Sequence, residues 1–352
     1  MLIIAEIGIN HDGNFEKALQ LIEAAARAGS KCVKFQCHVI EDEMIPLARD
    51  VIPGNANESI WNIMQRCAFS EEQDRKLKAY TEALGMLYLS TPFSRAAADR
   101  LNRMGVKAFK IGSGECNNYP LIRHINGFGK PVILSTGMNT WESIKKATDL
   151  LTVPYALLHC VSMYPTPYEK VHLKAMTELR ERYSGKPIGL SDHSIGIFTS
   201  LAAVALGATI IEKHFTLDRA WPGPDNCISI TPPELSALIK GAEAISLAMA
   251  GGKEVTGGER KTADFAYASV VSIKPIQAGD VMTMDNIWVK RPGGGIPADE
   301  YDNLLGKRLA CSIPSDVQID RGWIEAEEDS DSYGRQAWHR DVMRHSAARR
   351  RV

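Results

Sequence analysis

The feature of this sequence that most constrains its fold is a unit that recurs eight times between residue 2 and about residue 250. Each unit has a short apolar run, a polar or glycine-rich stop, and a segment with apolar residues at helical spacing, such as Ala18, Leu21 and Ala25. Apolar strands separated by helices are typical of a parallel sheet covered on both faces. Eight such units predict a (β/α)8 barrel, the TIM barrel fold.

The predicted strand cores are residues 2–8, 32–35, 86–89, 108–111, 131–134, 155–158, 188–190 and 209–211. A doubly wound open sheet is the alternative arrangement for alternating strands and helices. That alternative is disfavoured because no glycine-rich dinucleotide-binding fingerprint follows the first strand.

Two neighbouring predicted strands end in histidines, His193 and His214. If these strands are adjacent and parallel, both imidazoles emerge at the same rim of the sheet. Neutral imidazole is the commonest protein ligand of divalent metals. A lone histidine at a strand end is more often a plain polar residue, but a pair at matched positions favours a shared metal.

Two lysines, Lys34 and Lys110, lie inside otherwise apolar strands. An unpaired buried ammonium group is costly, so we expect an anion to face them, most simply a substrate phosphate or carboxylate. Hydrogen-bond donors near such an anion would be Ser113, Ser135, Ser191 and the amides of Gly112 and Gly114. The alternative role for a barrel lysine is Schiff-base formation.

Other polar residues follow the predicted strands where catalytic groups of such barrels lie. They are Glu6, Asn10, His11, Gln36, Ser90, Thr91, Glu115, Thr136, His159, Ser162 and Tyr164. Contact with water explains one or two polar strand ends, but not a polar end after every strand.

Two further segments are placed to reach the same rim. The connection at residues 41–70 is long for a barrel and predicts a lid or binding loop. The Pro-Gly-Pro sequence at residues 222–224 would hold Asp225 near the mouth, although a solvent-exposed turn aspartate fits the spacing equally well.

The C-terminal quarter has a different composition. Residues 251–268 are glycine-rich and charged, which predicts a linker, and residues 269–326 read as a small β-rich domain. Residues 327–352 combine an acidic run with arginines and predict a disordered tail, with an interaction arm as the alternative.

Charge and cysteine usage exclude several classes of protein. The net charge of −1 does not favour nucleic acid or an acidic membrane as a partner. The seven scattered cysteines include no C-x-x-C pair, and no signal peptide or membrane-spanning apolar run is present. We therefore expect a reduced, cytoplasmic protein.

Short motifs along nearly the whole chain to about residue 325 resemble those of the sialic acid synthases. The matching stretches are AEIGINHDG (5–13), VKFQ (33–36), STPF (90–93), FKIGSGECNNYPL (109–121), ILSTGM (133–138), YPTPYE (164–169), IGLSDH (188–193), IEKHFTLD (211–218), PGPD (222–225) and WVKRPGGGI (288–296). The resemblance implies a barrel followed by an antifreeze-like (SAF) domain. It also implies a domain-swapped homodimer in which Arg291 reaches the partner's sugar site.

The resemblance further implies the reaction and the residue roles. Such enzymes condense phosphoenolpyruvate with an N-acylated mannose-type sugar, here N-acetylmannosamine, and Mn²⁺ or Mg²⁺ would be held by His193 and His214. The catalytic residues near the reacting carbons would be Glu115, Glu6, Lys34 and Lys110. The substrate-binding residues would be Gln36, Thr91, Ser113, Ser135, Ser162, Tyr164, Ser191, Asp225 and Arg291.

Three alternatives remain open from the sequence. The same reaction on another sugar would give legionaminate, pseudaminate or a deaminated nononate. A Schiff-base aldolase would use Lys34 or Lys110. A carbohydrate- or ice-binding module would not need the polar residues at the barrel rim.

Overall fold

The computed structural model describes residues 1–326 of the 352-residue chain. The tail predicted at residues 327–352 lies outside the described residues. The chain divides into two compact units, one formed by Met1–Ala250 and the other beginning at Gly251.

The first unit is built on eight parallel strands. They are β1 (Leu2–Gly8), β2 (Cys32–Cys37), β3 (Leu87–Pro92), β4 (Phe109–Ile111), β5 (Val132–Ser135), β6 (Tyr155–Cys160), β7 (Ile188–Asp192) and β8 (Ile210–His214). Their order is β3-β2-β1-β8-β7-β6-β5-β4, and β3 also lies beside β4, so the sheet closes. The predicted (β/α)8 barrel is confirmed, and the open doubly wound sheet is excluded.

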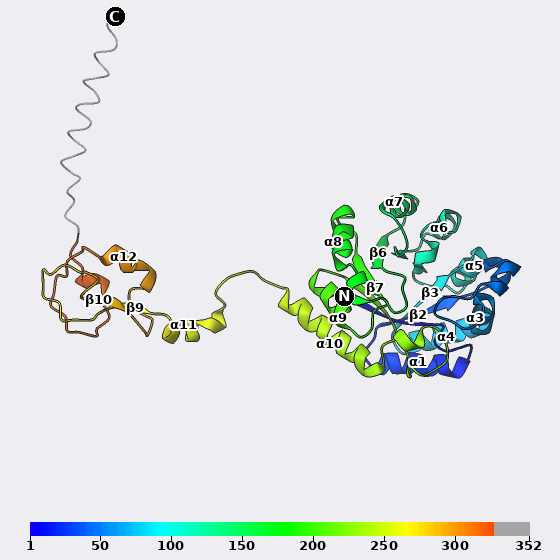
Figure 1. Ribbon diagram of the computed structural model, residues 1–352, viewed down its shortest axis with the longest axis horizontal. Helices are drawn as coiled ribbons and strands as arrows, with labels where there is room; N and C mark the ends of the chain where they lie inside the picture. Colours follow the sequence, from blue (N-terminus) through cyan, green and yellow to red (C-terminus); the bar gives the residue numbers. More distant parts are fainter. Residues whose placement is uncertain (327–352) are drawn as a thin grey trace, which may run out of the picture. The chain divides into compact units, whose positions relative to one another are not determined.

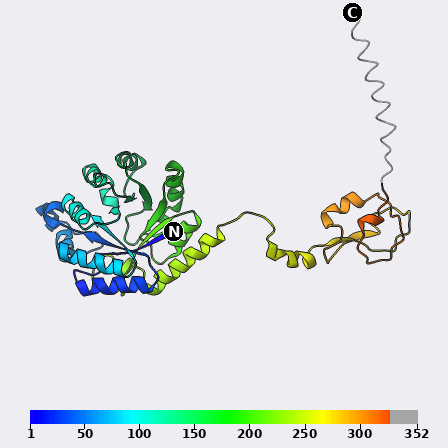
Figure 2. The same ribbon diagram turned by 180° about the vertical axis from the view of Figure 1, so that it is seen from behind.

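Helices surround this barrel, as Figures 1 and 2 show from opposite sides. They are α1 (Phe15–Arg27), α2 (Ile40–Glu43), α3 (Ile60–Cys67), α4 (Glu71–Ala83), α5 (Arg95–Arg103), α6 (Tyr119–Asn126), α7 (Trp141–Asp149), α8 (Leu173–Arg182), α9 (Phe198–Ala205) and α10 (Pro232–Ala248). Short 3-10 helices are η1 (Pro46–Asp50), η2 (Ser113–Glu115), η3 (Tyr168–Lys170) and η4 (Asn226–Ile228). None of the helices in residues 1–326 has the length and apolar character needed to span a membrane.

Several of these helices begin at a polar residue that caps the free backbone amides of the first turn. Ser70 and Gln73 form a reciprocal capping box at the start of α4. Asn14 caps α1 with a single contact, because its side chain accepts a hydrogen bond from the Lys17 amide. These caps explain why the helices start where the polar stops of the sequence lie.

The barrel strands bury two different faces. Outward side chains such as Val33 and Leu134 pack against the helices in the main core. Inward side chains near the N-terminal ends form a separate apolar cluster of Ile4, Cys32, Leu89, Ile133, Ala156, Leu158 and Ile210. Because side chains alternate along a strand, the next inward positions toward the C-terminal ends are Glu6, Lys34, Thr91, Lys110, Ser135, Cys160 and Glu212. The barrel interior therefore changes from apolar to charged along its axis.

The second unit contains a two-stranded antiparallel sheet of β9 (Ser269–Ser272) and β10 (Ile287–Lys290). Its other elements are η5 (Gly257–Glu259), α11 (Arg260–Ala266), η6 (Ala298–Glu300), α12 (Tyr301–Leu304) and η7 (Arg321–Trp323). A small cluster that includes Val270, Ile287 and Leu309 forms its core. The segment 251–268, predicted as a linker, thus contains the short helix α11.

Candidate active site

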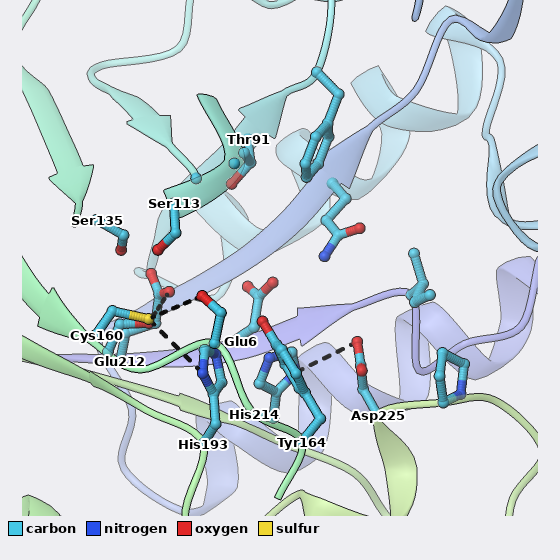
Figure 3. A pocket seen from close by; sticks show the side chains of 18 of the residues that line it. Glu6, Thr91, Ser113, Ser135, Cys160, Tyr164, His193, Glu212, His214 and Asp225 are labelled. Carbon is cyan, nitrogen blue, oxygen red and sulfur yellow. Dashed lines mark hydrogen bonds and ion pairs between the residues drawn. The ribbon is translucent and has the colours of Figure 1, made fainter. Parts of the chain in front are cut away.

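The C-terminal ends of the barrel strands open into a cavity of about 490 Å³. The residues to which the resemblance gives a role all line this cavity except Glu115 and Arg291, and Figure 3 shows ten of the lining residues by name. The other polar strand-end residues, Asn10, His11, Ser90, Thr136 and His159, do not line it. The predicted residues brought together are Glu6, Lys34, Gln36, Thr91, Lys110, Ser113, Ser135, Ser162, Tyr164, Ser191, His193, His214 and Asp225. The long connection 41–70 reaches the cavity through Pro53, Asn55, Ile60, Ile63 and Met64.

A buried cluster of two lysines and two carboxylates forms the floor of this cavity. Parallel pairing sets Glu6 on β1 beside Lys34 on β2, and the Lys34 Nζ lies 2.8 Å from Glu6 Oε1. Glu212 on β8 lies between the lysines, with its oxygens 3.9 Å from Lys34 Nζ and 3.4 Å from Lys110 Nζ. The expectation that an anion faces the lysines is confirmed, and the protein itself supplies two such anions, Glu6 and Glu212.

Burial and neighbouring charges shift the pKa values of Glu6, Glu212 and Lys110 in different directions. Burial raises the pKa of Glu6 to about 7, although Lys34 acts in the opposite direction. Burial also acts to raise the pKa of Glu212, but Lys110 and Lys34 outweigh it and lower that pKa. Burial lowers the pKa of Lys110. Glu6 is therefore the member of the cluster that exchanges a proton near neutral pH, and its Oε2 atom is buried without a hydrogen-bond partner.

We expect the Glu6→Gln variant to gain stability relative to the unmodified protein as the pH rises from about 4.5 to about 7. A carboxyl group with a raised folded-state pKa contributes stability that is present below its unfolded pKa and lost as pH rises through the folded value. Glutamine cannot ionise and escapes this loss. Urea unfolding of both proteins across this pH range measures the difference, and a pH-independent difference would contradict the assignment.

Hydroxyl groups complete the lining around the charged cluster. Thr91 Oγ1 accepts a hydrogen bond from Lys34 Nζ at 3.1 Å, and Ser135 Oγ accepts one from Lys110 Nζ at 2.8 Å. Ser191 Oγ donates to Glu212 Oε1 at 3.0 Å. These contacts hold the ammonium groups and the carboxylate in fixed positions.

Gly137 allows two further serines to approach each other beyond β5. The Gly137 amide donates to Ser113 Oγ at 3.0 Å. A Cβ atom at this position would lie 2.5 Å from Ser162 Oγ and 2.9 Å from Ser113 Oγ, so any other residue would force these hydroxyls to move. The glycine therefore allows both hydroxyls their present positions at the cavity wall.

The predicted histidine pair lies at the same rim, with the ring centroids of His193 and His214 5.4 Å apart (Figure 3). His193 Nδ1 lies 2.9 Å from the Val161 carbonyl oxygen, so this nitrogen carries a proton, and Nε2 is the nitrogen that could bind a cation when the ring is neutral. Burial lowers the pKa of His214 well below its ordinary value, and its Nδ1 has no hydrogen-bond partner. Both rings therefore offer a nitrogen to a cation.

Within residues 1–326, no group of three or more His, Cys, Asp or Glu residues is arranged to hold a metal ion. A cation bound by His193 and His214 would thus take its remaining ligands from solvent or substrate. Cys160 lies beside this pair, with Sγ 3.8 Å from His193 Nδ1. Burial acts to lower the pKa of His193, but Cys160 and the Val161 carbonyl outweigh it and raise that pKa to about 9.

Asp225 is buried at the cavity wall, with Oδ2 3.9 Å from His214 Nδ1, and burial raises its pKa to about 6. A solvent-exposed turn aspartate is therefore excluded. Asn10 fixes this loop, because its Nδ2 donates to Ser229 Oγ, which donates in turn to the Asp225 carbonyl. Tyr164 packs against the histidine pair, with its ring centroid 4.2 Å from that of His193.

Two residues to which the resemblance gives a role, Glu115 and Arg291, lie outside the cavity lining. Glu115 ends η2 and is half-buried, and its Oε2 accepts a hydrogen bond from Asn118 at 2.6 Å. Burial raises the pKa of Glu115. Arg291 is exposed and belongs to the second unit.

Comparison with known proteins identifies the family. The NeuB family model matches residues 21–254, and the SAF domain model matches residues 267–320. The chain belongs to the NeuB family.

Relatives match this NeuB-family chain over most of their length. It is 39% identical over 329 residues to the N,N'-diacetyllegionaminic acid synthase of Campylobacter jejuni, covering 90% of this chain and 98% of the relative. It is 32% identical to the human N-acetylneuraminate-9-phosphate synthase, covering 90% of each chain. A solved structure of N-acetylneuraminic acid synthetase from Leptospira borgpetersenii, in complex with citrate, is 34% identical with a TM-score of 0.68, and the match covers 74% of this chain and 89% of that one.

The NeuB-family membership makes the chain an enzyme of this family, which excludes the pure binding-module alternative. The SAF match confirms the predicted class of the small C-terminal domain.

Sequence reasoning missed Glu212 in this NeuB-family site. Its signal was available, because Glu212 lies two residues before His214 and so shares the inward face of β8. The connection 41–70 was predicted to reach the mouth of the barrel. The individual apolar residues with which it lines the cavity, Pro53, Ile60, Ile63 and Met64, were not predicted.

Proposed function

We propose that this protein catalyses the metal-dependent condensation of phosphoenolpyruvate with an N-acylated mannose-type sugar and water, releasing phosphate by C–O cleavage. The first candidate sugar is N-acetylmannosamine, which gives N-acetylneuraminate. The observation that carries the proposal is one cavity that joins a lysine–carboxylate cluster to a pair of histidines with free nitrogens. The named activities of the relatives support the same class of reaction.

The acceptor sugar has a specific alternative. The Campylobacter jejuni relative at 39% identity is named as an N,N'-diacetyllegionaminic acid synthase, and another relative, at 31% identity, as a pseudaminic acid synthase. A diacetamido sugar is therefore the second candidate acceptor, and a deaminated nononate is the third product class.

His193 and His214 fit a divalent cation, Mn²⁺ or Mg²⁺, because each ring keeps one nitrogen free of protein hydrogen bonds. When bound there, the cation would act as a Lewis acid on the aldehyde oxygen of the open-chain sugar. Ligand binding requires neutral imidazole, so loading the site would release the proton that His193 holds.

The charged cluster suits phosphoenolpyruvate. Lys34 and Lys110 supply positive charge, and Thr91, Ser113, Ser135, Ser162 and Ser191 supply hydroxyl groups for the carboxylate and phosphate oxygens. Protonation of Glu6, whose pKa is about 7, would leave the cluster with a net positive charge that attracts the anion.

The proposed chemistry forms the new C–C bond from the double-bond electrons of phosphoenolpyruvate, when its C3 attacks the aldehyde carbon. Positive charge then develops at C2, and water adds there. Glu115 would accept the proton of that water, or Glu6 would do so in its ionised form, since burial raises the pKa of both carboxyls. The aldehyde oxygen takes up a proton and becomes a hydroxyl group. At C2 the bond to the bridging oxygen breaks, phosphate leaves with that oxygen, and the C2 hydroxyl loses its proton to form the ketone.

The proposed sugar contacts are Gln36, Tyr164, Asp225 and Arg291. In a domain-swapped homodimer, Arg291 would reach the site of the other subunit.

We expect Arg291→Ala to raise the KM for the sugar about tenfold or more and to leave the KM for phosphoenolpyruvate unchanged, because a hydrogen bond from a charged group is lost. The matched control is Arg260→Ala, since Arg260 is also exposed in the second unit. Equal kinetics of the two variants would contradict the role of Arg291.

Phosphate release from phosphoenolpyruvate tests the proposed function. The assay compares N-acetylmannosamine, diacetamido-trideoxy sugars and mannose, each with Mn²⁺, with Mg²⁺ and with a chelator. Release that needs both a metal and one sugar supports the proposal and names the product. Activity that resists the chelator, together with borohydride trapping at Lys34 or Lys110, would instead support a Schiff-base aldolase. Burial lowers the pKa of Lys110, and a lowered pKa favours the neutral amine that forms a Schiff base.

A further inference from the structure

Two side chains, His38 and Glu43, form a hydrogen-bonded chain with Gln36, one of the proposed sugar contacts. His38 lies two residues further along the chain, and its Nε2 is 3.0 Å from Gln36 Oε1. Its other nitrogen, Nδ1, is 2.8 Å from Glu43 Oε2 at the end of α2. His38 thus connects a carboxylate outside the cavity lining to an amide that lines the cavity.

The His38 ring is held firmly in this position. It is buried, with 2% of its surface exposed, and it stacks on Phe93 with ring centroids 4.8 Å apart and an angle of 11° between the planes. Phe93 itself lines the cavity. The ring therefore cannot turn away from Gln36 without losing both hydrogen bonds and the stacking contact.

The partners of His38 determine which end of the Gln36 amide faces the cavity. The amide oxygen of Gln36 faces His38 Nε2, so this nitrogen is the donor of their hydrogen bond. The carboxylate of Glu43 holds the other ring nitrogen, Nδ1, in place. With its oxygen occupied, Gln36 keeps only its NH2 group for another partner.

The NH2 group of Gln36 is the end left available. Within residues 1–326 the Gln36 Nε2 atom has no hydrogen-bond partner. A Cβ atom built on Gly8, beside Glu6, would lie 3.4 Å from this nitrogen, which places it toward the end of β1. An oxygen that accepts hydrogen bonds would satisfy this free donor.

We infer that His38 and Glu43 are positioning residues that fix the Gln36 amide with its NH2 group toward the cavity, so that this side chain recognises an acceptor oxygen of the sugar. This inference rests on the proposed function for the identity of the ligand. Neither His38 nor Glu43 needs to touch the sugar, and both act through Gln36.

A double-mutant cycle on the complete protein tests this dependence. We expect Gln36→Ala and His38→Phe each to raise the KM for the sugar about tenfold, with the KM for phosphoenolpyruvate unchanged. The double variant should show about the same tenfold rise, because His38 has no effect once Gln36 is removed. Effects that multiply to about a hundredfold, or an unchanged sugar KM in His38→Phe, would overturn the inference.

A matched control separates this role from a loss of packing. His124 also pairs with a carboxylate, Asp99, at 2.7 Å and packs against a phenylalanine ring, but it lies outside the cavity lining. His124→Phe should leave the sugar KM unchanged. A rise equal to that of His38→Phe would show that the effect is structural.

A second measurement needs no substrate. In the unmodified protein labelled with ¹⁵N-histidine, NMR should show a proton on Nε2 of His38, with the signals assigned by their absence from His38→Gln. An unprotonated Nε2 would mean that the Gln36 amide is reversed and would overturn the inference. Absence of turnover with every sugar would count against the proposed function, while this NMR result would still decide the role of His38.

Discussion

Replacing Glu212 with glutamine is expected to lower the free energy of unfolding by about 3–5 kcal/mol, because it leaves Lys34 and Lys110 buried with only Glu6 as a carboxylate partner. Glutamine has a similar shape, so the loss arises from charge rather than from packing. Urea unfolding near pH 7 measures the change, and phosphate release measured on the same samples should fall as well.

Two companion variants make the Glu212 result specific. Glu72→Gln removes an exposed carboxylate that pairs with Lys76 on α4, and its effect on stability should be far smaller than that of Glu212→Gln, because solvent screens this pair. Lys110→Met combined with Glu212→Gln restores the charge balance and should be more stable than Glu212→Gln alone. A double variant no more stable than the single one would contradict a charge-balanced cluster.

Replacing His214 with alanine is expected to lower turnover by about a thousandfold or more, because one of two proposed cation ligands is lost and the cation would supply several kcal/mol of transition-state stabilisation. The barrel should stay folded. The His214 ring makes no hydrogen bond within residues 1–326, so its removal costs packing only.

The readouts for His214→Ala are turnover, Mn²⁺ binding by calorimetry and the thermal unfolding midpoint. Turnover and Mn²⁺ affinity should both fall, while the midpoint drops by only a few degrees. His124→Ala provides the control, since His124 is paired with Asp99 on the barrel surface. Normal Mn²⁺ affinity in His214→Ala would remove this histidine from the proposed metal site.

Much of the fold could be predicted because its signals are local. Apolar runs followed by helical spacing identified all eight barrel strands, and two histidines at matched strand ends were correctly placed at one rim. The strands β2, β3, β6, β7 and β8 extend two or three residues beyond the predicted cores, because their last residues pair with neighbours even though they are polar. Apolar content alone cannot mark the end of such a strand.

The pairing of charges within the site could not be predicted in the same way. The spacing from His214 indicates that Glu212 faces the barrel interior, but its contact with Lys110 joins residues more than a hundred positions apart in the chain and depends on the tertiary structure. The hydrogen bonds that link Glu43, His38 and Gln36 depend on the orientation of a side-chain amide, and sequence spacing does not predict that orientation. Contacts of this kind follow from tertiary structure.

The most direct test of the proposed reaction uses phosphoenolpyruvate labelled with ¹⁸O at the oxygen that bridges C2 and phosphorus. The protein is incubated with this substrate, Mn²⁺ and the sugar that supports turnover, and the released phosphate is analysed by mass spectrometry. C–O cleavage predicts that the phosphate retains the label. Unlabelled phosphate would show P–O cleavage and would contradict a condensation of this type.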